Sequence, residues 1–74
     1  MTRLPSLTGE QVVKALGKAG FQILRQKGSH VYLIHPDGRA TVVPVHKGES
    51  LGRGILRTII KDTDLSRADF LELL

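Results

Sequence analysis

Three histidines lie within residues 26–46, in the stretch QKGSHVYLIHPDGRATVVPVH, and the chain contains no others. His30 follows Lys-Gly-Ser, His35 precedes Pro-Asp-Gly, and His46 follows Val-Pro-Val. Imidazole groups can bind a metal ion, transfer protons near their ordinary pKa of about 6.5, or serve only a structural role. The choice between these roles depends on how the chain positions the three side chains.

Three segments around the histidines have the composition of β-strands: residues 21–26, 29–35 and 39–45 are rich in Val, Ile and Tyr. Pro-Asp-Gly at residues 36–38 is typical of a three-residue hairpin loop with a left-handed glycine. This loop predicts the cross-strand pairs His35–Arg39, Tyr32–Val42 and His30–Pro44. Pro44 then lies where no N–H is required, provided that the third strand is an edge of the sheet.

Side chains alternate between the two faces of a strand, so this register places His30 and His46 on one face and His35 on the other. His46 lies diagonally from His30, about 7–8 Å away between Cα atoms in a regular sheet. If Lys27 and Gly28 form a two-residue loop, Arg25 lies opposite His30 and completes a cluster at one end of the sheet.

The alternation does not by itself show which face the helices cover. It places Phe21 and Ile23 on the His30 face and Leu24 on the opposite face. We expect the helices to cover the face of Val31, Leu33 and Val43, which leaves His30 accessible.

Helical periodicity predicts helices over residues 9–19 and 51–62. Thr8 and Gln11 form a capping box at the first, and Gly20 ends it. Ser66 and Asp69 mark the start of a last short helical segment. The predicted class is α+β, with the order α-β-β-β-α, a three-stranded antiparallel sheet with helices on one face, and one domain over residues 1–74.

The chain has 74 residues, a net charge of +4 and a pI near 10.0, which favours an anionic partner such as nucleic acid. Only three residues are aromatic, so we expect little recognition by base stacking. The absence of cysteine, of a signal peptide at the first residues and of a long apolar run fits a cytoplasmic protein.

A metal site built from all three histidines is disfavoured because His35 lies on the other face and no cysteine is available. Serine hydrolysis is also disfavoured, because Ser29 and His30 are adjacent and point to opposite faces of a strand. RNA cleavage fits these residues, because RNA carries its own nucleophile, the 2′-hydroxyl, and needs none from the protein. A histidine can act as the acid or base, and cations can stabilise the phosphate without a metal or other cofactor. The groups available for this chemistry are Arg25, Lys27, His30, His46 and Lys47.

Arg53, Arg57 and Lys61 recur at intervals of four residues along the second helix and form a basic stripe suited to phosphate contacts. Two alternatives to an enzyme therefore remain open. The chain could be a non-catalytic RNA-binding module that uses this stripe, or a protein-interaction domain.

The segments LTGEQVVKALGKAGF, RQKGSH, HPDGRATVVPVH and GILRTIIKDTDLSRADFL together resemble the HicA toxin family of toxin–antitoxin pairs. The resemblance implies a fold like that of double-stranded-RNA-binding domains, mRNA interferase activity, and a HicB antitoxin that masks the active site. It implies that His30, in the Gly-Ser-His element, is the catalytic histidine, and His46 matches a recurrent histidine of the family. From their places near His30, we count His46, Arg25, Lys27 and Ser29 as candidates for auxiliary roles.

Two positions depart from the pattern of that family. Many relatives carry a polar residue or a second histidine where this chain has Val31, and a small turn containing glycine where it has Asp62-Thr63-Asp64.

Overall fold

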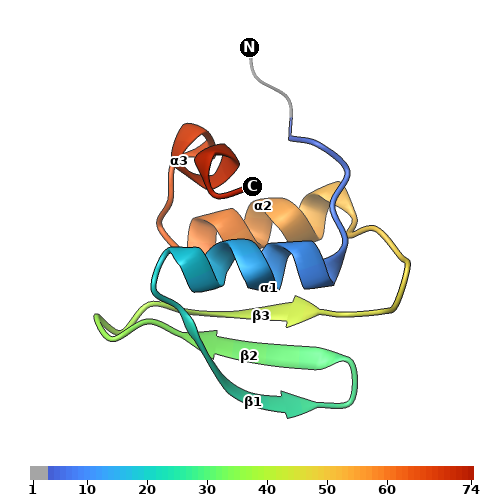
Figure 1. The fold of residues 1–74 in the computed structure, drawn as a ribbon, viewed down its shortest axis with the longest axis horizontal. Helices are drawn as coiled ribbons and strands as arrows, with labels where there is room; N and C mark the ends of the chain where they lie inside the picture. The colour runs from blue at the N-terminus through green and yellow to red at the C-terminus, as the bar shows by residue number, and fades with distance from the viewer. Residues whose placement is uncertain (1–3) are drawn as a thin grey trace.

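The computed structural model describes residues 4–74 and contains three helices and three strands within that range (Figure 1). In chain order they are α1 (Gly9–Lys18), β1 (Gln22–Lys27), β2 (His30–Ile34), β3 (Ala40–Pro44), α2 (Arg53–Asp62) and α3 (Arg67–Glu72). The strands form one antiparallel sheet in the order β1-β2-β3. The predicted α+β class and element order are confirmed.

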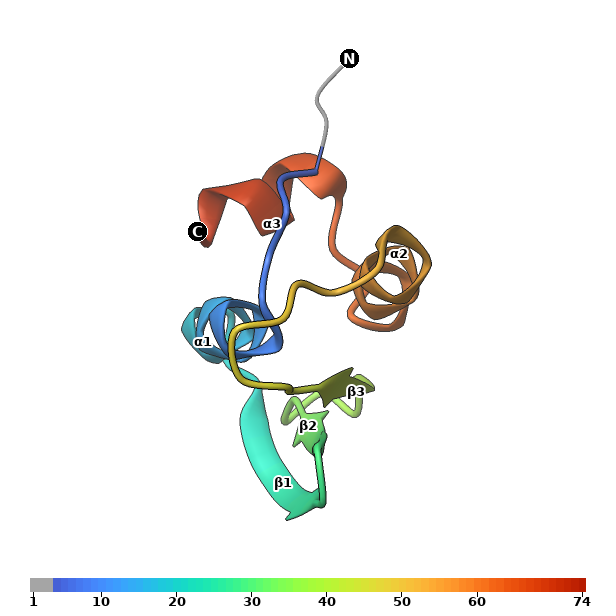
Figure 2. The same ribbon diagram turned by 90° about the vertical axis from the view of Figure 1, so that its right-hand side faces the viewer.

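The helices lie on one side of the sheet in two tiers. Helices α1 and α2 run side by side over the sheet, and α3 lies beyond them, on their far side from the strands (Figures 1 and 2). Among residues 4–74, no helix covers the opposite face of the sheet (Figures 1 and 2).

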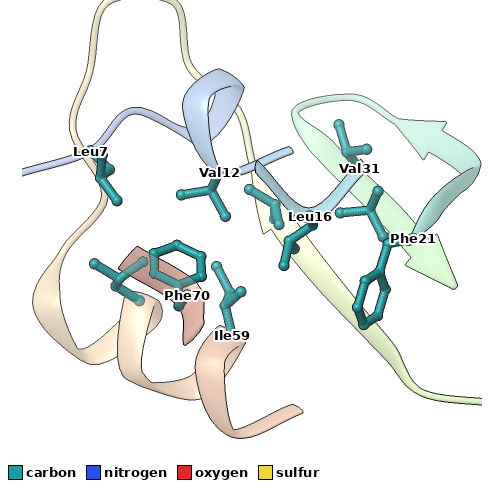
Figure 3. Packing of buried hydrophobic residues seen from close by; sticks show 10 residues of the cluster. Leu7, Val12, Leu16, Phe21, Val31, Ile59 and Phe70 are labelled. Carbon is teal, nitrogen blue, oxygen red and sulfur yellow. The ribbon is translucent and has the colours of Figure 1, made fainter. Parts of the chain in front are cut away.

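The core lies between the sheet and the helices. Val31, Leu33 and Val43 are buried on the sheet, and Phe70 of α3 is fully buried above the two larger helices (Figure 3). Helices α1 and α2 contribute Val12, Leu16, Leu56 and Ile59 to this core, and the loop residues Leu7 and Phe21 complete it. The prediction that the helices cover the Val31 face is therefore confirmed, and the His30 face is open.

The limits of α1 follow from its capping residues. The Thr8 hydroxyl accepts a hydrogen bond from the Gln11 N–H at 3.2 Å, and the Gln11 side chain accepts one from the Thr8 N–H at 2.9 Å. At the other end, Gly20 adopts φ +99°, and the Phe21 N–H donates to the Leu16 carbonyl at 3.0 Å. This is the left-handed glycine ending that the sequence predicts, and α1 ends at Lys18, one residue early.

The β2–β3 hairpin has the predicted register. The His35 N–H donates to the Arg39 carbonyl at 2.8 Å, and Gly38 adopts φ +98°. Tyr32 pairs with Val42, and His30 pairs with Pro44. Because β3 is an edge strand, the missing N–H of Pro44 removes no hydrogen bond from the sheet.

The predicted register of β1 is wrong. The turn consists of Gly28, with φ +58°, and Ser29, so Lys27 rather than Arg25 lies opposite His30. Arg25 pairs with Tyr32, one position further along the same face. The turn is displaced by one residue because Gly28, which tolerates positive φ, occupies its first position.

A β-bulge between Ile23 and Arg25 changes the faces of the residues before it. Ile23 pairs with Leu33 of the helix-covered face, and Phe21 is buried in the core. Leu24 is exposed and lines a hollow with Tyr32 and Val42 of the open face. The predicted faces of Phe21, Ile23 and Leu24 are therefore wrong, because a bulge adds one residue to a strand and reverses the alternation.

The segment after β3 leads to α2, which begins at Arg53 instead of the predicted residue 51. The Leu51 N–H donates to the Leu7 carbonyl at 2.7 Å, which ties this segment to the residues before α1. After α2, Asp64 adopts φ +53°, the only positive φ at a non-glycine residue among residues 4–74. The Asp62-Thr63-Asp64 turn thus takes a left-handed backbone conformation without a glycine.

The start of α1 lies against the end of β3, and this contact requires a glycine. A Cβ atom at Gly9 would overlap the carbonyl oxygen of Pro44 and lie 3.0 Å from the Cα of Val45. We expect Gly9→Ala to lower the free energy of unfolding by about 1–3 kcal/mol, the usual cost of overpacking. Urea denaturation followed by circular dichroism would measure this change.

Gly17→Ala is the matched control, since Gly17 lies in the same helix with no atom within 4 Å of an added Cβ. It should raise the free energy of unfolding by up to about 1 kcal/mol through better helix propensity. Equal stability of the two variants would show that α1 does not press against β3.

Candidate active site

His30 is the first residue of the central strand, at the end of the sheet where the β1–β2 turn lies. Its side chain is exposed on the open face, and its neighbours across the sheet are Lys27 on β1 and Pro44 on β3. The Val45 N–H donates to the Ser29 carbonyl at 2.6 Å, so the turn before His30 is tied to the end of β3. The backbone around His30 is thus held by hydrogen bonds on both sides, and its imidazole remains open to solvent.

Two cations share the open face with His30. Lys27 lies directly across from it, and Arg25 lies two residues further along β1, on the same face. The guanidinium carbon of Arg25 is 4.7 Å from the centre of the Tyr32 ring, in a cation–π arrangement. The predicted cluster of Arg25 with His30 is therefore replaced by a Lys27–His30 pair beside an Arg25–Tyr32 pair.

His46 and Lys47 lie just past the end of β3, and both side chains are exposed. The Glu49 N–H donates to the His46 carbonyl at 2.9 Å, which closes a turn with Gly48 at φ +77°. Val45 packs against the core, and alternation then favours the open face for the next residue, His46. The placement of His46 beside His30 stays a prediction.

His35 lies on the helix-covered side, as predicted. Its ring meets Phe21 edge-on with 5.1 Å between centroids, and its Nδ1 accepts a hydrogen bond from the Asp37 N–H at 3.1 Å. Only 19% of the side chain is exposed. The His35 ring is therefore largely covered, packed against the buried Phe21.

The hairpin loop near His35 contains an ion pair between Arg39 and Asp37. Arg39 Nε lies 2.9 Å from Asp37 Oδ2, and Arg39 Nη1 donates to the Thr63 carbonyl at 2.6 Å. The pKa of Asp37 is held below its ordinary value, chiefly because the Arg39 backbone N–H donates to the carboxylate. These groups stabilise the loop and lie at the end of the sheet away from His30.

The basic stripe on α2 does not join the His30 group. Thr58 and Asp62 line the same hollow as Val42, so this side of α2 faces the β3 edge. Arg57 directly precedes Thr58, and Lys61 directly precedes Asp62. Successive side chains of a helix point about 100° apart, so Arg57 and Lys61 point away from this side of α2. The stripe therefore forms a separate, exposed basic surface with Arg53.

No group of three or more His, Cys, Asp or Glu side chains in residues 4–74 is arranged to hold a metal ion. In the same range, every helix is too short or too polar to cross a membrane.

Sequence reasoning placed Tyr32 on the His30 face but did not count it among the site residues. Its position two residues after His30 on the same strand was the available signal. What the sequence does not show is that Arg25 pairs with Tyr32, because that pairing depends on the position of the β1–β2 turn.

Comparison with known protein families gives one result that bears on this site. The chain matches the family described as the HicA toxin of bacterial toxin–antitoxin systems over residues 9–65, a segment that contains α1, all three strands and α2. No curated protein gives a significant match. The matched segment includes the Gly-Ser-His element with His30, as well as His46. The chain belongs to the HicA toxin family.

Proposed function

We propose that this HicA toxin is an endoribonuclease that cuts messenger RNA, an mRNA interferase, with His30 as its main acid–base group. The observation that carries the proposal is the position of His30, which is exposed on an open sheet face directly across from Lys27. Membership of a toxin family supports it, because cutting messenger RNA would stop growth in a bacterial cell.

The proposed reaction uses the 2′-hydroxyl of the RNA as the nucleophile. The 2′-oxygen forms a bond to phosphorus, its proton passes to a base, and the bond from phosphorus to the 5′-oxygen breaks as that oxygen gains a proton. The products are a 2′,3′-cyclic phosphate and a 5′-hydroxyl end. His30 transfers one of the two protons, and His46 is the candidate for the other.

The charge that develops on the phosphate needs a nearby cation. Lys27 lies across from His30 and is placed to provide it, with Arg25 further along the strand. Ser29 in the turn and Lys47 beside His46 are further candidates for contacts to the RNA backbone. The reaction as proposed uses no metal or other cofactor.

The proposed partner of the toxin is a HicB-type antitoxin that covers the open face and so keeps RNA away from His30 in the cytoplasm. A second candidate function is an RNA-binding module without catalysis. It is favoured by the stripe of Arg53, Arg57 and Lys61, because this basic surface lies apart from His30.

The first test is His30→Ala. We expect wild-type protein to cleave single-stranded or messenger RNA in the presence of EDTA, and the variant to lose about 10²–10⁴-fold in rate, the usual contribution of an acid–base group. Because His30 is exposed, the variant should unfold at the same urea concentration as the wild type. Gel analysis of end-labelled RNA would give the rate and show the cyclic phosphate.

His35→Gln is the matched histidine control. It removes the contact with Phe21, so it should lower stability without changing the cleavage rate of the folded protein. Full activity of His30→Ala, or loss of wild-type cleavage in EDTA, would refute the mechanism. If the wild type binds RNA but cuts none, the binding-module function is correct.

The second test neutralises the stripe with Arg53→Gln, Arg57→Gln and Lys61→Gln together. RNA affinity should fall for all sequences. The slope of log K against log salt concentration should become less negative by about 2, the value for losing three phosphate contacts to a single strand. Turnover at saturating RNA should stay the same, since loss of uniform binding raises KM and spares kcat. Titrations at two salt concentrations would measure both effects, and unchanged affinity would confine RNA contact to the sheet.

A further inference from the structure

The open face of the sheet carries an aromatic side chain next to His30. We propose that Tyr32 and Arg25 bind one unpaired nucleobase of single-stranded RNA, adjacent to the phosphate at His30. This inference deepens the proposed function, because it rests on RNA as the ligand of the same face and defines which form of RNA the site accepts.

The spacing along β2 suits a base next to a phosphate. Tyr32 follows His30 by two residues, so both side chains leave the same face, about 6–7 Å apart along the strand. Arg25 lies across from Tyr32 and places its guanidinium carbon 4.7 Å from the ring centre. A guanidinium plane and a phenol ring are both surfaces on which nucleobases stack.

Apolar side chains extend this surface. Leu24 is 63% exposed and Val42 is 36% exposed, and both line a hollow with Tyr32. Thr58 and Asp62 of α2 lie at the margin of the same hollow. The Asp62 carboxylate, which lies on α2 and not on the strands, accepts a hydrogen bond from Thr41 Oγ1 at 3.1 Å, and Thr58 Oγ1 donates to the Gly54 carbonyl at 3.0 Å. An exposed apolar surface with hydrogen-bonding groups at its margin is what a flat heterocycle requires.

The charge of the sheet selects an anion. The sequences of β1, β2 and β3 contain Arg25, Lys27 and His30 but no aspartate or glutamate. A polyanion can therefore lie across the strands without meeting a carboxylate on them. This charge pattern favours RNA over an apolar or basic protein segment as the occupant.

The geometry requires single-stranded RNA. Bases in a duplex stack on each other, and a side chain on a sheet reaches only a base that has left the stack. Of the chain's three Phe, Tyr and Trp residues, Phe21 and Phe70 are buried, so Tyr32 presents the one phenyl-type ring beside the His30 imidazole on the open face. The site therefore recognises one base, at a fixed position relative to the cut.

The test measures binding separately from cleavage, in His30→Ala protein with fluorescein-labelled RNA oligonucleotides. Adding Tyr32→Leu, which keeps apolar bulk and removes the ring, should weaken single-strand affinity about 5- to 150-fold, the effect of losing one stacked base. Tyr32→Phe should restore it, and Arg25→Lys, which keeps the charge and loses the plane, should weaken it. Ile34→Ala is the control, because Ile34 lies on the same face two residues further from His30.

An oligonucleotide series with one abasic nucleotide at each position in turn identifies the contacted base. At one position, the abasic nucleotide should weaken RNA binding to the His30→Ala protein. At the same position it should not weaken binding to the protein that also carries Tyr32→Leu, because that protein no longer stacks on the missing base. The proposal would be overturned if Tyr32→Leu left the RNA affinity of the His30→Ala protein unchanged. It would also be overturned if abasic nucleotides weakened RNA binding equally in both proteins. The proposal would also be overturned if Tyr32→Leu lost binding to a HicB-type antitoxin but kept its RNA affinity, since the face would then serve a protein.

The outcome is separable from that of the proposed function. If the protein with His30 intact cuts no RNA but binding depends on Tyr32 as described, the nuclease proposal fails and the base site stands. If it cuts RNA with equal rates in the wild type and Tyr32→Leu, and their affinities match, the nuclease proposal stands and the base site fails.

Discussion

The sheet buries Val31, Leu33 and Val43 beneath α1 and α2, and this one-sided burial decides what the other face presents. Because side chains alternate, each buried residue of β2 is flanked by one that must point to solvent. His30, Tyr32 and Ile34 are those residues. A chain of this size has few places for a rigid site, and here the core that stabilises the fold also orients the exposed groups.

The hairpin of β2 and β3 could be predicted from sequence to the residue, because Pro-Asp-Gly allows one loop type and Pro44 independently fits the resulting register. The β1–β2 turn could not, since Lys27-Gly28 and Gly28-Ser29 both place a glycine in a two-residue loop. The bulge before Arg25 has no glycine or proline to mark it. One undetermined turn and one unmarked bulge were enough to misplace Arg25, Phe21, Ile23 and Leu24.

The candidate site was predicted in part for the same reason. The exposed place of His30 on the open face was predicted because strand parity and the β2–β3 register fix it, and neither depends on β1. The partner of His30 was misidentified, since Lys27 and Arg25 share a face and only the turn decides which is opposite. Tyr32 was undervalued because a count of aromatic residues says nothing about which ones are buried, and here two of the three are.

The two edges of the sheet carry different obstacles to a further strand. On β3, Pro44 has no N–H to offer at the outer edge, and on β1 the bulge twists the backbone between Ile23 and Arg25. The unpaired edge of a sheet is otherwise a template to which further copies can add strand by strand. Proline and bulge both disfavour such pairing at the two edges, and neither places a side chain in front of His30.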